Sequence, residues 1–274
     1  MPLGANSYGK SGIRLVKVTR RGVKHDLRDL TVAVRFEGEF EAAHAAGDNS
    51  DVLPTDTMKN TVYALAKELP VEEIEEFALA LSDHFLRENP QVSRLGVSIE
   101  ERVWGRIGAT AFEGSSNERR TARASRSREG GAVESGVKGL LIAKSAQSGF
   151  SGFRRDRYTT LKETSDRILA TSLTAVWTHT SAAGPFAGLW EAVRRTLLET
   201  FAAHESASVQ RTLFVMGEAA LGEHRKLADI RLTMPNKHHL LVDLSPFGLT
   251  NENEIFVATE EPYGLIEATV TRER

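Results

Sequence analysis

The stretch IRLVKVTRRGVKHDLRDLTVAVRF, from Ile13 to Phe36, carries the pattern that decides the fold. Its first part, Ile13–Arg20, alternates β-branched and polar residues, which predicts a strand. From Leu30 onward, apolar residues recur at every second position and fall on one face of a second strand. The residues between them, Arg21–Asp26, suit a hairpin connection. The segment therefore predicts an antiparallel strand pair with one apolar face.

Two helices are expected after this strand pair. Thr55–Lys67 (TDTMKNTVYALAK) has helical character, and Thr55–Asp56 is interpreted as its N-cap. Val71–Glu88 places large apolar residues at helical spacing, and Pro90 follows its end. Weaker strand-like runs follow at Val92–Trp104 and Arg120–Arg128. The first half thus predicts strands, then helices, then strands.

The second half repeats this order. The expected elements are, in turn, strands Val137–Lys144 and Leu173–Thr178, helices Phe186–Phe201 and Val209–Ala220, and strands near Ile230–Met234, Leu240–Leu244 and Leu265–Thr271. Two ββααββ modules, 1–134 and 135–274, therefore form an α+β protein with antiparallel sheets and helices on one face. Open sheets of this kind have edges that must be covered, which favours a homo-oligomer.

Composition excludes several classes of protein. The chain has 274 residues and a formal net charge of -2, so no charge imbalance indicates a nucleic-acid or membrane partner. It contains no cysteine, which removes disulfides, thiolate metal sites and thiol nucleophiles. The N-terminus lacks the apolar core of a signal peptide, and the C-terminal VTRER is not the S-K-L address. We therefore expect a cytoplasmic protein.

Two sequence patterns are interpreted as having no ligand. Gly4–Ser11 fits the P-loop pattern G-x-x-x-x-G-K-[ST], but a strand follows it where a P-loop needs a helix. Five arginines lie within Arg119–Arg128, but no aromatic residue is interleaved with them, so a solvated hairpin is preferred to a nucleic-acid patch.

Taken one at a time, the remaining polar candidates have ordinary structural explanations. Lys10 fits an exposed terminal lysine, Arg167 a helix salt bridge, Gln210 a surface side chain, and His238 a structural histidine. His238 and its neighbour His239 would point to opposite faces of a strand, so together they make a poor metal site. Spacing alone does not assemble a site from these residues.

Six segments in order nevertheless resemble the urate oxidase (uricase) family. They are Tyr8-Gly-Lys10 with IRLVKVTR, LPTDTMKNTVYALAK at Leu53–Lys67, KGLLIAKSAQSGFSGFRRDRYTTLKETSDRILAT at Lys138–Thr171, SVQRTLFVMG at Ser208–Gly217, MPNKHHLLVDL at Met234–Leu244, and PYGLIEAT at Pro262–Thr269. The resemblance implies the tunnelling fold, in which tandem ββααββ modules assemble into a homotetramer around a barrel-like tunnel. It also implies active sites shared between subunits, and no metal or organic cofactor.

The resemblance assigns roles to individual residues. It implies that Lys10 and Thr55 form a proton relay with His238, and that Asn236 with Thr55 holds oxygen and water. It also implies that urate is held by Phe150, which stacks on the purine, and by Arg167, Gln210 and the backbone N–H of Val209, which bind its edge. Thr55 and Asp56 are expected from one subunit and the other residues from its neighbour.

These residue types suit the chemistry that the resemblance implies. Urate is a flat anion rich in acceptors, and Arg provides a rigid two-pronged donor that Lys does not match. Urate itself is electron-rich, so its oxidation by O2 to 5-hydroxyisourate and hydrogen peroxide needs a proton acceptor and a place for oxygen. Two alternatives remain open: another tunnelling-fold enzyme that acts on purines or pterins, and a noncatalytic purine-binding protein.

Overall fold

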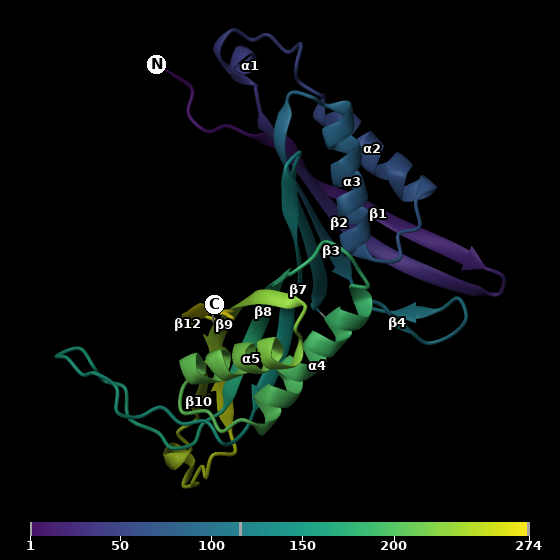
Figure 1. Ribbon diagram of the computed structural model, residues 1–274. Helices are drawn as coiled ribbons and strands as arrows, with labels where there is room; N and C mark the ends of the chain where they lie inside the picture. Colours follow the sequence, from purple (N-terminus) through teal and green to yellow (C-terminus); the bar gives the residue numbers. More distant parts are fainter. Residues whose placement is uncertain (1, 115–116, 273–274) are drawn as a thin grey trace. The chain divides into compact units, whose positions relative to one another are not determined.

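The computed structural model describes residues 2–114 and 117–272 (Figure 1). Its contacts divide the chain into two compact units. The first contains Met1–Gly136 and Val176–Trp190, and the second contains Val137–Ala175 and Glu191–Arg274. The major elements follow the order strand, strand, helix, helix, strand, strand, and then the same order again.

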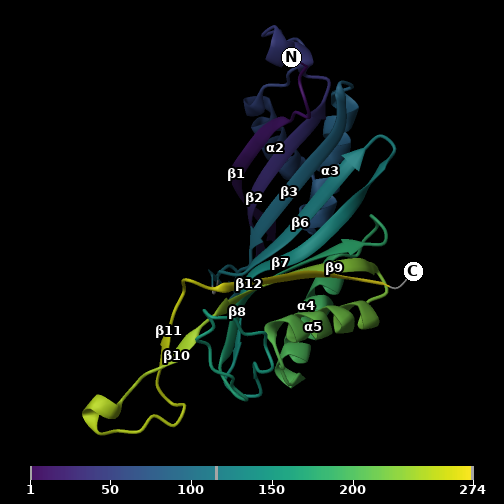
Figure 2. The same cartoon turned by 90° about the vertical axis from the view of Figure 1, so that its left-hand side faces the viewer.

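The first unit is built on a sheet with the strand order β1-β2-β3-β6-β7. The strands are β1 Tyr8–Arg21, β2 Lys24–Gly38, β3 Val92–Arg102, β6 Arg119–Ser127 and β7 Gly130–Lys144, of which β7 continues into the second unit. The helices are α1 Glu41–Ala45, α2 Thr55–Glu68 and α3 Ile74–Glu88, and a small ribbon joins β4 Gly105–Arg106 to β5 Phe112–Glu113. Strands β1, β2, β3 and β6 pair antiparallel, and Figure 2 shows them side by side with α2 and α3 on one face.

The alternation seen in the sequence explains this packing. Every second residue of β2 from Leu30 to Phe36 is buried, as the sequence predicts. Helix α2 buries Met58, Val62 and Ala66, which are spaced one helical turn apart, and α3 buries a longer apolar stripe. Helix α2 packs on β1, and α3 packs on β3 and β6. One apolar layer therefore lies between the sheet and its helices.

The second unit repeats the arrangement with the strand order β7-β8-β9-β12. Two elements cross the boundary between the units, β8 Leu169–His179 after Ala175 and α4 Ala187–Ala203 before Glu191. The others are α5 Val209–Glu223, β9 Leu227–Lys237, β10 His239–Leu241, the 3-10 turn η1 Ser245–Phe247, β11 Phe256–Ala258 and β12 Gly264–Thr271. Helix α5 packs on β9 and β12. A side chain at Gly217 would collide with Val270 of β12, because an added Cβ would lie 2.5 Å from its Cγ2. Glycine at this position therefore allows α5 to approach the sheet closely.

The predicted α+β class with tandem tunnelling-fold modules is confirmed, while some boundaries differ. Helix α3 begins at Ile74 and not at Val71, because Glu73 is extended and forms the N-cap position. The expected strand at Leu240–Leu244 is shorter and pairs only with β11. Gly4–Ser11 runs directly into β1, so it lacks the following helix that a P-loop requires. Within the described residues, no helix has the length and apolar character needed to cross a membrane.

The interpretation of Arg119–Arg128 as a solvated hairpin holds for its exposed Arg123 and Arg128 but not for Arg120. Residues 119–127 form β6, which pairs with β3, and Arg120 is buried. Its Nη2 lies 2.5 Å from Oε2 of the buried Glu75 on α3. The guanidinium of Arg128 binds the carbonyl oxygens of Leu86 and Asn89 at the end of α3. Two of these arginines thus hold α3 on the sheet.

Glu75 is the centre of a buried polar network in the first unit. The hydroxyl of Ser135 donates to Oε1 of Glu75 at 2.5 Å and lies 2.7 Å from Nε2 of His179. Because a serine has one hydroxyl proton, Ser135 accepts from Nε2–H of His179 when it donates to Glu75. Burial raises the pKa of the Glu75 carboxyl, while the charge of Arg120 and the Ser135 hydrogen bond act against that rise. The charge of Arg120 therefore offsets part of the free-energy cost of burying the Glu75 carboxylate.

We predict that Arg120→Ala lowers the free energy of unfolding by about 3–5 kcal/mol, because it leaves the Glu75 charge buried and unpaired. Arg123→Ala is the matched control, since Arg123 lies on the same strand but is exposed, and its effect should stay within about 0.5 kcal/mol. Urea unfolding followed by circular dichroism measures both. Equal, small losses in the two variants would contradict the role of the buried pair.

Candidate functional site

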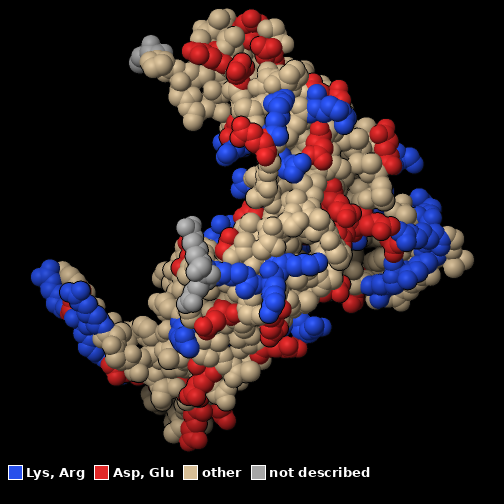
Figure 3. Space-filling view, viewed as in Figure 1, with Lys and Arg blue, Asp and Glu red and all other residues tan. Residues whose placement is uncertain are grey.

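Phe150 and Arg167 lie together in the second unit. The backbones of Phe150 and Thr164 exchange two hydrogen bonds, of 2.8 and 3.1 Å, which close the base of the loop that projects from this unit. Cζ of Arg167 lies 5.3 Å from the centroid of the Phe150 ring. The loop beyond this base carries Arg154, Arg155, Arg157 and Lys162, and Figure 3 shows its concentration of basic side chains. The structure therefore brings together two predicted site residues from opposite ends of a loop.

Arg167 does not form the helix salt bridge that its sequence context indicated. It lies in an extended segment just before β8 and is half-buried. Burial lowers the pKa of its guanidinium, which nevertheless stays charged at neutral pH. In the part of the chain that the structure describes, its Nε atom is buried and has no hydrogen-bond partner. A buried donor without a partner is costly, so this guanidinium is suited to an incoming acceptor.

Backbone hydrogen bonds tie this pair to the start of α5. The N–H of Gly149 donates to the carbonyl of Ser206 at 2.8 Å, and the N–H of Ser206 donates to the carbonyl of Gln147 at 2.9 Å. The buried hydroxyl of Thr212, on the first turns of α5, donates to the Ser206 hydroxyl at 2.7 Å. The strand-like segment that carries Phe150 is therefore fastened beside the N-terminus of α5.

Val209 and Gln210 are the first two residues of α5. The side chain of Ser208 forms the N-cap and accepts from the N–H of Arg211 at 3.1 Å. The first N–H groups of a helix lack intrahelical acceptors and carry partial positive charge, so they bind anions. Val209 has a buried side chain, whereas Gln210 is exposed. The backbone at Val209 and the Gln210 amide can therefore both donate to an external anion.

Asn236 and His238 lie at the end of β9, the strand on which α5 packs. Asn236 pairs with Gly264 of β12, and His238 follows the strand. The carbonyl of His238 accepts from the N–H of Thr259 at 2.9 Å, which holds the backbone at this point. Both side chains are half-buried. Within the described ranges, no hydrogen bond or ion pair joins them to Phe150 or Arg167.

The other three predicted residues lie in the first unit. Lys10 faces Val34 across the β1–β2 pair, immediately before an irregularity at which Gly12 adopts a φ of 70°. Its charge contributes to lowering the pKa of Asp56, after the larger effects of the hydrogen bond and charge of Lys59. Asp56 also accepts from Nδ2 of Asn60 at 3.0 Å. Lys10 and Asp56 of one chain are therefore electrostatic neighbours.

Thr55 does not act as the N-cap of α2. The N-cap is Pro54, which offers no side-chain hydrogen bond, and Thr55 is the first helical residue. A hydroxyl at this position is not consumed by capping, so it can take part in a site. The first-unit set is thus Lys10, Thr55 and Asp56. Lys10 belongs to the same unit as Thr55 and Asp56, whereas the expectation groups it with the second-unit residues of the neighbouring subunit. That grouping stays a prediction.

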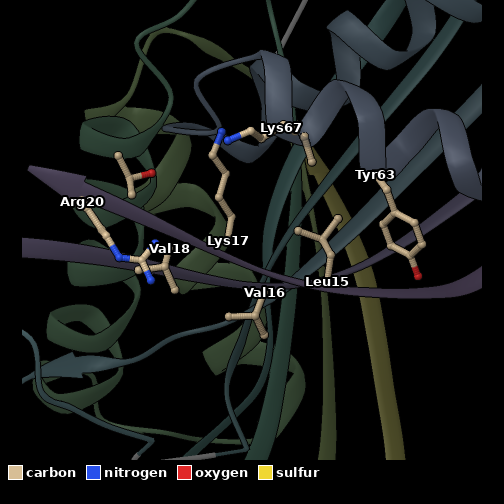
Figure 4. Close-up of a pocket in the computed structure, with 9 residues that line it drawn as sticks. Leu15, Val16, Lys17, Val18, Arg20, Tyr63 and Lys67 are labelled. Atoms are coloured by element: carbon tan, nitrogen blue, oxygen red, sulfur yellow. The ribbon is translucent and has the colours of Figure 1, made fainter.

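A hollow in the first unit does not coincide with the predicted residues. A cavity of about 570 Å³ lies between β1 and α2 and is lined by Leu15, Lys17, Tyr63 and Lys67 among others (Figure 4). None of the predicted site residues lines it. Lys17 does not point freely into it, because its ammonium group donates to the carbonyl of Leu69. Of the predicted residues, Lys10, Thr55 and Asp56 belong to the first unit and the others to the second.

Comparison with known proteins identifies the family. The family model described as uricase matches residues 6–131 and 133–267, which is nearly the whole chain. The chain belongs to the uricase family. The uricase of Arthrobacter globiformis is 45% identical over 99% of this chain and 90% of its own length. The uricase of Dictyostelium discoideum is 36% identical over 97% of this chain and 96% of its own length.

Solved uricase structures share the fold. The crystal structure of the uricase from Arthrobacter globiformis superposes with a TM-score of 0.96 at 45% identity and covers 100% of this chain and 96% of its own. A urate oxidase from Bacillus sp. TB-90 superposes with a TM-score of 0.86 at 22% identity, which shows likeness of fold alone. The family predicted from the six segments is confirmed.

Sequence reasoning missed the serines that hold this uricase-family site together. Ser206 links the Phe150 segment to α5, and Ser208 caps the helix that begins at Val209. A serine directly before an apolar helical run is the ordinary N-cap signal, so Ser208 was within reach of the sequence. The backbone hydrogen bonds of Ser206 could not be predicted in this way, because they join it to Gln147 and Gly149, which are distant in the sequence.

We predict that Ser208→Ala lowers stability by about 1 kcal/mol, because it removes the side-chain cap of α5. Ser208→Asp should retain most of that stability, since a carboxylate also caps and favours the positive end of the helix. Thermal unfolding of both variants beside the parent protein measures the difference. Equal loss in the alanine and aspartate variants would show that capping is not the role of this serine.

Proposed function

We propose that this chain oxidises urate with O2 and water to 5-hydroxyisourate and hydrogen peroxide. Membership of the uricase family makes it an oxidoreductase of the urate oxidase class. The observation that carries the proposal is the placement of the Arg167 guanidinium against Phe150, in a segment fastened to the N-terminus of α5. This arrangement suits a flat anion with acceptors along its edge. It combines the Phe150 ring, the Arg167 guanidinium and the free N–H groups at the start of α5.

The proposed substrate clamp consists of Phe150, Arg167, Val209 and Gln210. Phe150 stacks on the purine and fixes its height, as aromatic pairs prefer offset stacking. Arg167 donates two parallel hydrogen bonds to the edge of urate, the N–H of Val209 donates a third, and the Gln210 amide both donates and accepts. Each charge-assisted bond contributes about 1.5–3 kcal/mol. The half-buried Arg167 therefore sets much of the affinity.

The proposed chemistry needs proton transfer and a site for oxygen. Lys10 and Thr55 remove a proton from urate and pass it on with His238, while Asn236 and Thr55 hold oxygen and then water above the ring. Urate, O2 and H2O together supply the atoms of 5-hydroxyisourate and H2O2. Two electrons leave urate and reduce O2 to peroxide, and the oxygen of water becomes the new hydroxyl. No metal or organic cofactor takes part in this scheme.

We further propose that the working enzyme is a homotetramer with sites shared between subunits. Support comes from the division of the predicted residues, since Lys10, Thr55 and Asp56 belong to one unit and the clamp belongs to the other. In this scheme one subunit supplies Lys10 together with Thr55 and Asp56, and its neighbour supplies the clamp, Asn236 and His238. The module boundary at 134/135 and the cytoplasmic location stay parts of the proposal.

The expected result of a urate assay is loss of the urate ultraviolet band together with oxygen uptake and peroxide release, under air and with EDTA present. The same reaction under nitrogen should stop. Urate binding without oxygen uptake would indicate a noncatalytic purine-binding protein. Loss of activity in EDTA that returns with added metal would overturn the cofactor-free mechanism.

Paired variants test the shared site. We expect Arg167→Lys to raise KM at least tenfold, because Lys cannot make the two-pronged contact, and Lys10→Met to lower kcat about a hundredfold or more. Arg154→Lys and Lys24→Met are the controls, since both parent residues are exposed. When the two impaired variants are co-expressed, mixed oligomers should contain some sites with both native residues, and activity with a low KM and a high kcat should return.

Co-expression that restores nothing, although mixed oligomers are found by mass spectrometry, would place the whole site within one chain. That result would contradict sharing while leaving the urate oxidase activity of the parent protein intact.

A further inference from the structure

Two stacked rings and two guanidinium groups lie together at the projecting loop and its base. The rings of Phe150 and Phe153 are 5.0 Å apart between centroids and inclined by 12°, which is a stacked pair. Cζ of Arg167 lies 5.3 Å from the centroid of Phe150, and Cζ of Arg155 lies 4.9 Å from that of Phe153. Each ring thus contacts the other ring and one guanidinium. Neither Phe153 nor Arg155 has a part in the scheme above.

A backbone turn at Gly152 brings the ring of Phe153 against the ring of Phe150. The two residues are three positions apart, and Gly152 between them adopts a φ of 66°, a conformation that L side chains avoid. The N–H of Gly152 donates to Oε1 of Glu163 at 3.3 Å, and the same oxygen lies 3.8 Å from Nη2 of Arg155. Glu163 therefore fixes both the turn before Phe153 and the cation beyond it.

The stacked pair does not belong to the apolar core. Phe153 is half-buried, and its neighbours Gly152 and Arg154 are exposed. A phenyl ring placed at the surface on a glycine turn is poorly explained by stability alone. Its principal contact is the ring of Phe150, the residue to which the proposed function assigns purine stacking. Its effect must therefore reach the substrate through Phe150.

We propose that Phe153 is a positioning residue that sets the tilt of the Phe150 ring presented to the purine. This inference rests on the proposed function. Phe153 stacks on one face of the Phe150 ring with the two planes inclined by 12°, so the plane of Phe150 follows that of Phe153. The near-parallel contact also holds the Phe150 plane steady relative to Arg167, so that stacking and edge binding are satisfied by one orientation of urate.

The test separates the effect of the aromatic ring at position 153 from the effect of an apolar side chain without a ring. Phe153→Leu keeps an apolar side chain but removes the ring, whereas Phe153→Tyr keeps the ring. We expect Phe153→Leu to raise KM about three- to tenfold, the range that loss of an aromatic pair gives, with kcat changed less than twofold. Phe153→Tyr should restore KM to within twofold of the parent. Phe247→Leu is the control, because Phe247 is an exposed phenylalanine of the same unit.

Urate binding under nitrogen, followed by titration calorimetry, should show the same weakening for Phe153→Leu and the same recovery for Phe153→Tyr. A merely structural role would lower the amount of active protein and therefore the maximal rate, without moving KM or the dissociation constant. An unchanged KM in Phe153→Leu, or equal effects of Leu and Tyr, would overturn the inference. If the parent protein itself does not oxidise urate, the proposed function fails, which is a distinguishable outcome.

Discussion

The pair of backbone hydrogen bonds at Ser206 is the constraint on which the candidate site depends. It joins two segments that are distant in the chain, one carrying Phe150 and the other leading into α5. Backbone bonds are short and directional, so they fix the height of the Phe150 segment beside the helix more firmly than a surface side-chain contact would. The exchange between Phe150 and Thr164 then transmits this placement to the strand that leads to Arg167. These hydrogen bonds thereby fix the base of the loop between Phe150 and Thr164.

The two groups proposed to bind the substrate edge, Arg167 and the N-terminus of α5, both carry positive charge. Arg167 forms no ion pair with a carboxylate in the part of the chain that the structure describes, and the N-terminus of α5 adds the partial charge of its free amides. The nearby carboxylates of Asp166 and Glu163 accept from the backbone N–H groups of Ser148 and Gly152. A half-buried guanidinium without a counterion is costly unless an anion neutralises it. The net charge of the whole chain, -2, does not reveal this local feature.

Periodicity in the sequence was sufficient for the framework of the fold. The alternation from Leu30 to Phe36 and the helical stripe of α3 report burial on one face, and the structure buries those faces. The endings of elements were less predictable, because Glu73 and Pro54 take cap positions through backbone geometry and not through the usual capping side chains. The role of Arg120 was hidden as well, since its partner Glu75 comes from a helix far away in sequence.

The candidate site, like the fold, was predictable from the sequence only in part. Arg167 looked like a helical surface residue, and only its environment in three dimensions reveals a half-buried guanidinium against Phe150. The family resemblance supplied its assignment, because spacing carries no information about contacts across a loop. Phe153 escaped notice for a related reason. A phenylalanine three residues from another is common, and only the turn at Gly152 makes the two rings meet.

The first unit borrows residues 176–190 from the second half of the sequence. Within that borrowed piece, the N–H groups of Phe186 and Ala187 at the start of α4 both donate to the carboxylate of Glu73, at 2.9 Å each. Just past residue 134, Ser135 donates to Glu75 and in turn contacts His179. A fragment ending at 134 would deprive Glu73 of these two amide donors and leave Glu75 with Arg120 but without Ser135. Its complement would begin α4 on amides that lack this carboxylate. The duplicated halves are thus not interchangeable building blocks.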